Sequence, residues 1–187
     1  MTNIKNILFL GDSLTAGYGL QNPERESFPG RIQQKINQAG LPYRVINAGI
    51  SGDTSAGGLA RLDYWISRPI DVFVLELGIN DIMRGVPPST TFHNLDAIIR
   101  RVKTKYPDTK IALMGMDFEL PFSHSLITEF RTIFKRLADT QRVTLVPFFL
   151  EGVMGQRTLN LPDGLHPSAK GYEVIAEKIW PVLLTLL

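Results

Sequence analysis

The sequence predicts a doubly wound α/β sandwich, in which helices cover both faces of a parallel sheet. Short apolar runs alternate with amphipathic helical patterns along the whole chain. One of these runs, at residues 72–75, is apolar at every position rather than at every second one. Such continuity is typical of a strand that is buried on both faces. Strands of this kind, joined by helices, wind with right-handed crossovers into a layered α/β fold.

Five runs are expected to form the strands of this sheet. Each is short and rich in Val, Ile, Leu or Phe. The expected strands are Ile4–Gly11, Tyr43–Ala48, Asp71–Gly78, Lys110–Met116 and Arg142–Phe148.

Helices are expected between these runs, because apolar residues recur there at spacings of three and four. One helix follows Ser27, with Pro29 in its first turn, and another precedes the third strand. Others follow Ser89, the fourth strand and Ser168. The apolar positions are Phe28, Ile32, Ile36, Leu59, Leu62, Ile66, Phe92, Leu95, Ile99, Val102, Tyr106, Leu126, Phe130, Ile133, Leu137, Tyr172, Ile175, Ala176 and Ile179.

Length and composition favour one domain that spans residues 1–187. The chain is 44% hydrophobic, and a domain of this length buries roughly 70% of its unfolded surface. The formal net charge is +2, and no basic tail indicates nucleic-acid binding. The segment 100–105 is the densest basic stretch, and we expect it to be a solvated helix face. The chain contains no cysteine, which excludes disulfides, zinc thiolate sites and cysteine nucleophiles.

No segment of the sequence has the length of a targeting or membrane segment. The apolar run at residues 7–10 holds four residues, whereas a signal core needs roughly 7–15 and a membrane span about 20. We therefore expect no stable membrane insertion. The expected location is the cytoplasm, or the periplasm or exterior if a leader has been removed.

Four polar segments that contain glycine follow predicted strands. In open α/β sheets, ligands bind beyond the carboxyl ends of the strands, so these segments are expected to converge at one edge. They are Gly11–Ser13, Asn47–Asp53, Gly78–Asp81 and, after a longer loop, Pro162–Pro167. Neither a Gly-Lys-Ser/Thr phosphate loop nor Gly-x-Gly-x-x-Gly follows the first strand, which argues against nucleotide binding.

Ser13, His166 and Asp163 are candidates for nucleophilic catalysis. A serine hydroxyl needs a base, usually histidine, and a carboxylate fixes the tautomer of that base. Asp163 precedes His166 by three residues, so its carboxylate can reach Nδ1 and leave Nε2 to face Ser13. The other histidines, His93 and His124, are expected to be structural or solvated. The alternative is that Ser13 only caps the next turn.

Three donors could stabilise an oxyanion in acyl transfer, where each donor can be worth roughly 3–4 kcal/mol. They are the backbone N–H groups of Ser13 and Gly52 and the side-chain amide of Asn80. The alternative roles are a cap, a turn glycine and a loop asparagine. Ser51 and Ser55 are also loop serines, but neither directly follows a strand. The chain has no Gly-x-Ser-x-Gly elbow, which argues against an ordinary α/β-hydrolase.

At these residues the chain resembles the SGNH, or GDSL, hydrolases. Four blocks occur in family order, and they cover nearly the whole chain between residues 11 and 166. "GDSLTAGYG" and "VPFFLEGV" are most similar to the bacterial branch of multifunctional thioesterases, arylesterases and lysophospholipases. The four blocks are Gly11-Asp12-Ser13-Leu14, Gly52 within "NAGISGDTSAGGLARL", Gly78-Ile79-Asn80-Asp81 and Asp163-Gly164-Leu165-His166.

The resemblance implies the SGNH hydrolase fold, a flavodoxin-like three-layer α/β/α sandwich with a five-stranded parallel sheet in the order 2-1-3-4-5. It implies Ser13 as nucleophile, His166 as base and Asp163 as its orienting partner. Ser13, Gly52 and Asn80 would form the oxyanion hole, with no metal and no cofactor. Asp12 and Asp81 would hydrogen-bond loop backbone and hold the site open.

In this branch, the segment after strand three and the loop after strand four shape the acyl site. Here those are residues 82–88 and 116–122, and the second departs from the Pro-Asn-x-Gly pattern of many arylesterase-like relatives. The substrate-binding candidates are Met83, Val86, Leu120 and Phe122, although all four could equally be loop packing.

The sequence thus predicts a serine esterase or thioesterase for small to medium acyl groups, acting through an acyl-enzyme. One alternative is a carbohydrate acetylesterase of the same superfamily. A metal-dependent phosphoesterase using Asp12, Asp81, Asp163 and His166 is disfavoured by the few histidines. A non-catalytic flavodoxin-like binding module would have no need for the full residue set. The expected partner is a small-molecule ester or thioester, and the expected state is a monomer or homodimer.

Overall fold

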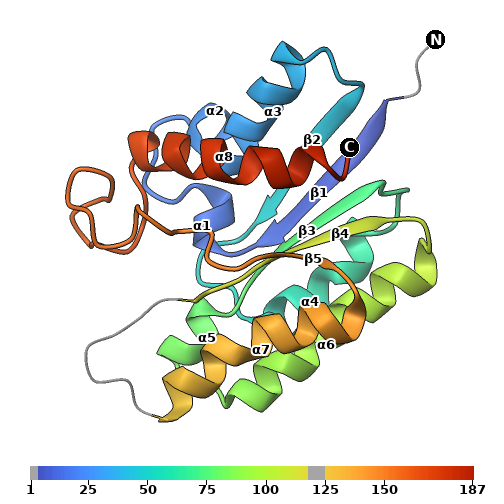
Figure 1. The fold of residues 1–187 in the computed structure, drawn as a ribbon, viewed down its shortest axis with the longest axis vertical. Helices are drawn as coiled ribbons and strands as arrows, with labels where there is room; N and C mark the ends of the chain where they lie inside the picture. Colours follow the sequence, from blue (N-terminus) through green and yellow to red (C-terminus); the bar gives the residue numbers. More distant parts are fainter. Residues whose placement is uncertain (1–3, 118–124) are drawn as a thin grey trace.

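The computed structural model describes residues 4–117 and 125–187 of the chain. In these ranges it contains a five-stranded parallel sheet in the order β2-β1-β3-β4-β5, with helices on both faces (Figure 1). The predicted doubly wound sandwich and the strand order implied by the resemblance are both confirmed. The strands are β1 Lys5–Gly11, β2 Tyr43–Gly49, β3 Val72–Glu76, β4 Lys110–Met114 and β5 Thr144–Val146.

Two groups of helices form the outer layers. One face of the sheet is covered by α3 (Phe28–Gln38) and α8 (Ala169–Leu184), which pack on each other. The other face is covered by α4 (Ser55–Trp65), α6 (Pro88–Lys105) and α7 (Ser125–Gln141). Every helix that the periodicity predicts is present.

Three short helices have no counterpart among the predicted elements. They are α1 (Ser13–Ala16), α2 (Pro23–Glu26) and α5 (Ile79–Met83). A helix of four or five residues is too short to show a repeating apolar face, so periodicity does not reveal it. Both α1 and α5 start within two or three residues of a strand end, at the edge where the polar segments were expected to meet.

The central strands lie in the core, as the continuous apolar run predicts. All five residues of β3 are buried, and so are residues 7–11 of β1. The core includes several fully buried aromatic side chains, and the rings of Phe9 and Phe28 pack edge to face at 5.2 Å. This rigid centre fixes the positions at which the strands end.

Several boundaries differ from the prediction, and β3 ends at Glu76, two residues before the expected Gly78. Strands β4 and β5 are shorter than expected, because after Gly115 the ladder gives way to an isolated antiparallel bridge between Met116 and Phe148. Helix α6 begins at Pro88, one residue before Ser89. Proline suits the first helical position because its fixed φ matches the helix and its missing N–H would have no intrahelical partner there.

Ser168 caps the last helix as its position predicts: its Oγ accepts a hydrogen bond from the backbone N–H of Gly171 at 3.3 Å. We expect Ser168→Ala to lower the free energy of unfolding by about 1 kcal/mol, since one N–H at the helix start loses its acceptor. Urea unfolding measures this change. The matched control is Ser89→Ala, which removes an exposed serine from the first turn of α6 and should be neutral or slightly stabilising. Equal losses in the two variants would contradict the capping role.

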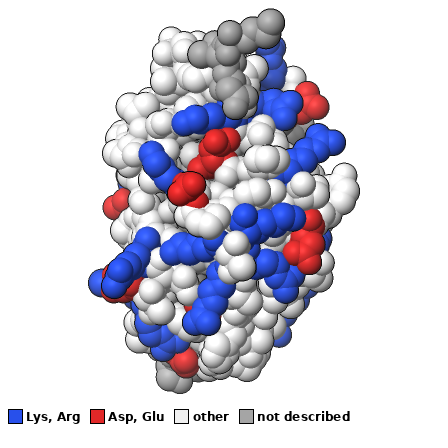
Figure 2. Space-filling model, turned by 90° about the vertical axis from the view of Figure 1, so that its right-hand side faces the viewer, with Lys and Arg blue, Asp and Glu red and all other residues white. Residues whose placement is uncertain are grey.

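The charges lie mostly on the surface. Figure 2 shows the face at which the strands begin, where Lys and Arg stand out with Asp and Glu between them. The expected solvated basic face lies at the end of α6, where Arg100 pairs with Asp96 and Arg101 with Asp63. Within residues 4–117 and 125–187, no helix is long and apolar enough to cross a membrane.

Candidate active site

The site begins with the alignment of three strand ends. Gly11, the last residue of β1, lies opposite Gly49 of β2 and Glu76 of β3. Because these strands are parallel and end together, the segments that follow them leave from the same edge of the sheet. Helix α1 follows β1 directly and begins with Ser13.

Ser13, His166 and Asp163 form one chain of hydrogen bonds. The Oγ of Ser13 lies 2.8 Å from Nε2 of His166, and Nδ1 of His166 lies 2.7 Å from Oδ2 of Asp163. The other oxygen of Asp163 accepts the backbone N–H groups of Leu165 and His166, both at 2.9 Å. The carboxylate therefore fixes the turn and the imidazole together.

The electrostatics of Asp163 suit this arrangement. Partial burial acts to raise the pKa of its carboxyl, but the hydrogen bonds from the His166 backbone and ring and from the Leu165 backbone act the other way, and the pKa is lowered. Asp163 is therefore ionised at neutral pH and accepts the proton on Nδ1. This selects the tautomer in which Nε2 is free to accept a proton from Ser13.

The cap of α1 is Asp12 rather than Ser13. Oδ1 of Asp12 accepts the backbone N–H of Leu14 at 2.9 Å. The capping role that was the alternative for Ser13 therefore belongs to its neighbour, and the Ser13 hydroxyl faces His166 instead. This contact also shows Asp12 bonding loop backbone, as the resemblance implies.

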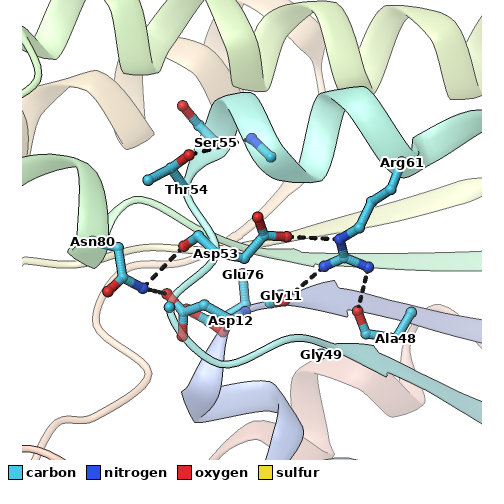
Figure 3. A network of polar contacts seen from close by, with 12 residues as sticks. Gly11, Asp12, Ala48, Gly49, Asp53, Thr54, Ser55, Arg61, Glu76 and Asn80 are labelled. Atoms are coloured by element: carbon cyan, nitrogen blue, oxygen red, sulfur yellow. Dashed lines mark hydrogen bonds and ion pairs between the residues drawn. The ribbon is translucent and has the colours of Figure 1, made fainter.

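Asn80 connects the segment that carries Ser13 to the segment that carries Gly52. Nδ2 of Asn80 donates to Oδ2 of Asp12 at 3.0 Å and to the carbonyl of Asp53 at 2.9 Å (Figure 3). It therefore bridges the residue before Ser13 and the residue after Gly52. Both N–H groups of the Asn80 amide already donate hydrogen bonds. Asn80 can therefore stabilise an oxyanion only if one of these N–H groups also donates to the oxyanion.

The backbone N–H groups of Ser13 and Gly52 have no hydrogen-bond partner among the described residues. Gly52 has a φ of 80°, in the left-handed region that glycine adopts without strain. Its carbonyl accepts Nη2 of Arg84, in the segment after α5, at 2.7 Å. Gly52 is thus held through its carbonyl, while no described residue occupies its N–H.

Arg61 of α4 ties three segments together behind these groups. Its guanidinium donates to Oδ2 of Asp53 at 2.6 Å, to the carbonyl of Ala48 at 2.7 Å and to the carbonyl of Gly11 at 2.9 Å. Figure 3 shows the fork of Arg61 reaching the ends of β1 and β2. The Arg61 and Asp53 side chains are only 17% and 12% exposed. The guanidinium therefore fixes the loop that carries Gly52 against the end of β1.

A pair of buried carboxyls lies beneath the nucleophile. Oε2 of Glu76 accepts the hydroxyl of Thr15 at 2.7 Å and the backbone N–H of Asp12 at 3.3 Å, whereas Oε1 has no partner among the described residues. Burial raises the pKa of Asp12 to about 7, against the hydrogen bonds from Leu14 and Asn80 that act to lower it. Burial and the nearby charge of Asp12 raise the pKa of Glu76 well above its ordinary value. At neutral pH the pair therefore does not carry two full charges.

This pair gives the fold a measurable pH dependence. As pH rises above 4.5, the unfolded chain releases the Glu76 proton while the folded chain keeps it, so the free energy of unfolding falls until the raised folded-state pKa is passed. Glu76→Gln removes this titration and should flatten the decrease. Urea unfolding at several pH values from 5 to 9 measures the slope.

The matched control is Glu173→Gln, because the Glu173 side chain is 59% exposed and its only ion pair among the described residues is a 3.9 Å contact with Arg31. This variant should keep the wild-type slope. A Glu76→Gln protein with the wild-type slope would show that Glu76 does not titrate with a raised pKa.

Asp81 anchors the helices around the site. Its carboxylate accepts the backbone N–H of Ser55 at 2.8 Å and the hydroxyls of Ser55 and Thr91 at 2.5 Å and 3.2 Å. It therefore joins α5 to the starts of α4 and α6. Within the described residues, no three His, Asp, Glu or Cys side chains are grouped so that they could hold a metal ion.

The substrate-binding candidates are only partly placed. Met83 is 65% exposed at the end of α5, and Val86 is half-buried in the segment that follows. Leu120 and Phe122 lie outside the described residues, as does His124. His93 lies within α6, where its ring packs against Phe92 at 5.9 Å.

Three residues of the site are absent from the sequence-based candidates. Glu76 carries a signal in retrospect, because an acid interrupts the otherwise apolar run at the end of β3. Tyr18, whose ring centroid lies 4.7 Å from that of His166, stands between two glycines shortly after the nucleophile. Arg61 carries no signal that distinguishes it from any other arginine on a helix.

Known proteins are similar to this chain in sequence and in fold. Residues 9–174 match the model of the GDSL-like lipase/acylhydrolase family. The chain is 35% identical to esterase TesA of Pseudomonas aeruginosa over 184 residues, which cover 98% of this chain and 90% of that protein. It is 37% identical to an arylesterase of Vibrio mimicus over 176 residues, 92% of this chain and 85% of the relative. It is 34% identical to thioesterase 1/protease 1/lysophospholipase L1 of Escherichia coli over 172 residues, 91% and 79% of the two chains.

Solved structures of esterases have the same fold as this chain. The crystal structure of TesA superimposes with a TM-score of 0.91 at 35% identity and covers 98% of this chain and 100% of its own. The psychrotrophic esterase EstA from Pseudoalteromonas has a TM-score of 0.88 at 30% identity, with 97% of each chain covered. The chain therefore belongs to the GDSL-like lipase/acylhydrolase family and is an SGNH-type serine esterase.

Proposed function

We propose that the protein hydrolyses carboxylic esters and thioesters of small to medium acyl groups, with Ser13 as nucleophile. The observation that carries this proposal is the continuous hydrogen-bond chain from Ser13 Oγ through the His166 ring to Asp163. A hydroxyl within 2.8 Å of an imidazole nitrogen whose tautomer is fixed from the far side is the arrangement that an acyl-enzyme mechanism requires.

In acylation, Oγ of Ser13 forms a bond to the carbonyl carbon while Nε2 of His166 takes the hydroxyl proton. The tetrahedral intermediate then collapses, the bond to the leaving oxygen or sulfur breaks, and His166 returns the proton to that atom. In deacylation, a water molecule takes the place of Ser13 and gives its proton to Nε2, the acid departs, and Oγ regains a proton. Asp163 keeps its charge throughout and stabilises the imidazolium.

The negative charge on the carbonyl oxygen would be met by the backbone N–H groups of Ser13 and Gly52 and by Asn80. These two backbone donors have no partner within the part of the chain that the structure describes, which supports their role, because preorganised donors need no rearrangement when the charge develops. Asn80 would contribute by sharing an N–H that now goes to Asp12 or Asp53.

The acyl group would contact residues at the end of α5 and in the segment that follows it. Met83, which is exposed, and Val86, which is half-buried, are the described candidates, with Leu120 and Phe122 as further candidates outside the described residues.

The proposal is tested by the hydrolysis of p-nitrophenyl esters from acetate to palmitate. We expect turnover with the highest kcat/KM at short to medium chain lengths and a decline towards palmitate. A protein that releases acetate from acetylated sugars, with no gain from longer acyl chains, would be a carbohydrate acetylesterase instead. Absence of turnover with this series and with acyl thioesters would overturn the proposal.

We also infer that residues 1–187 act as one domain and that the enzyme is a monomer or homodimer. All the residues assigned to catalysis come from one chain, which supports a site that is complete without a partner. Light scattering coupled to size-exclusion chromatography tests the oligomeric state, and a larger assembly would contradict it.

A further inference from the structure

Tyr18 places an exposed aromatic ring directly beside His166. The two ring centroids are 4.7 Å apart and the ring planes are inclined by 45°. Even with this contact, 52% of Tyr18 remains exposed. The mechanism described above gives this ring no role, although it stands next to the group that takes and returns the proton.

The turn that carries Tyr18 is held on two sides. The backbone N–H of Tyr18 donates to the carbonyl of Ser13 at 3.1 Å, which joins the turn to α1. The next residue, Gly19, packs closely on Leu161: a Cβ at this position would lie 2.4 Å from Leu161 Cδ1. Leu161 in turn donates its N–H to the carbonyl of His166 at 2.7 Å. The backbone that carries the ring is therefore held relative to both the nucleophile and the base.

The reaction places the leaving group at this ring, an argument that rests on the proposed function. Nε2 of His166 must return its proton to the leaving oxygen, so that oxygen comes within hydrogen-bond distance of Nε2. The alcohol part of the ester then extends from a point beside the imidazole. The Tyr18 ring lies beside the same imidazole, and its exposed part is available for contact.

We propose that Tyr18 is a specificity-determining residue that contacts the leaving group and favours esters whose alcohol part is aromatic. Aromatic rings gain energy from stacked or edge-to-face contact beyond the gain from buried area alone, by an amount that corresponds to roughly a two- to tenfold change in rate. The tyrosine hydroxyl is not required for this contact, but the ring is.

A second role for the ring would have different consequences. If Tyr18 only supports the imidazole, its loss impairs proton transfer to every substrate alike and changes the pH profile of the reaction. If it contacts the leaving group, its loss alters the ratio between substrates that share an acyl group. The comparison must use kcat/KM, because the leaving group has departed before deacylation and does not affect that step.

The experiment uses three acetate esters: benzyl, cyclohexylmethyl and methyl acetate. The first two have alcohol parts of similar size and differ in whether the ring is aromatic. We expect Tyr18→Ala to lower the ratio of kcat/KM for benzyl over cyclohexylmethyl acetate by about two- to tenfold. Tyr18→Phe, which keeps the ring, should keep the wild-type ratio. The matched control is Tyr64→Ala, which removes a 75% exposed tyrosine on α4 and should change neither ratio nor rate.

An equal loss of kcat/KM for the three esters in Tyr18→Ala, or no loss at all, would overturn the leaving-group role while leaving the esterase proposal intact. A changed ratio in Tyr18→Phe as large as that in Tyr18→Ala would also overturn it, because the hydroxyl would then be the cause. A wild-type protein that hydrolyses none of the three, nor the p-nitrophenyl series, would instead overturn the proposed function itself.

Discussion

Ser13→Ala should lower kcat for p-nitrophenyl butyrate by about four to six orders of magnitude. The methyl group of alanine cannot attack the ester carbonyl, so no acyl-enzyme forms. Some acceleration over water should persist, because the backbone donors of residue 13 and Gly52 do not depend on the side chain. The loss should therefore appear in kcat more than in KM.

This variant should fold normally. The cap of α1 is provided by Asp12, so removal of the Ser13 hydroxyl leaves the hydrogen bond to Leu14 in place. Thermal unfolding of Ser13→Ala should match that of the wild type within about 1 kcal/mol. The control is Ser51→Ala, which removes an exposed loop serine and should keep the wild-type rate. A Ser13→Ala protein that is folded and retains more than a tenth of the activity would show that Ser13 is not the nucleophile.

Arg61→Ala should lower the free energy of unfolding by about 2–4 kcal/mol. The substitution removes the arginine donor from the carboxylate of Asp53 and from the carbonyl of Ala48, in a region where the side chains are largely buried. The carbonyl of Gly11 also loses this donor but still accepts the backbone N–H of Ile50. Unpartnered buried polar groups are costly because they have lost water as well as the protein partner. Urea unfolding measures the change.

The esterase activity of Arg61→Ala should also fall, because the substitution changes the position of Gly52. The Asp53 side chain is held by Arg61 and its carbonyl by Asn80, so loss of the guanidinium loosens the segment that carries the Gly52 donor. Arg61→Lys should restore part of the stability but little of the rate, because an ammonium cannot reproduce the fork that reaches three acceptors. The control is Arg101→Ala, whose ion pair with Asp63 is exposed and should be worth less than 1 kcal/mol. If Arg61→Ala is as stable and as active as Arg101→Ala, the guanidinium does not position the site.

The layers of the fold could be predicted from the sequence, because they follow from apolar periodicity. The run at 72–75 is apolar at every position since β3 is buried on both faces, and the helices show spacings of three and four. The ends of the shorter strands could not be predicted. The bridge between Met116 and Phe148 is a contact between distant segments, and no local pattern specifies it.

The catalytic residues of the candidate site could be predicted from the sequence, because each combines a reactive side chain with a place after a predicted strand or in a characteristic spacing. Ser13 directly follows a strand, and the Asp163–His166 spacing brings a carboxylate to the imidazole within one turn. The supporting contacts were not predictable in the same way. Arg61 reaches the carbonyls of Gly11 and Ala48, and any residue can supply a carbonyl. The occupied state of the Asn80 amide likewise depends on the packing of three segments.

The measurement that tests the central claim most directly is mass-spectrometric mapping of the protein after treatment with a p-nitrophenyl alkylphosphonate. This reagent transfers its phosphonyl group to an activated serine and releases p-nitrophenol. We predict one adduct per chain, on the peptide that contains Ser13, formed together with loss of esterase activity and absent in Ser13→Ala. An adduct on another residue, or inactivation of Ser13→Ala at the wild-type rate, would contradict the assignment of Ser13 as the nucleophile.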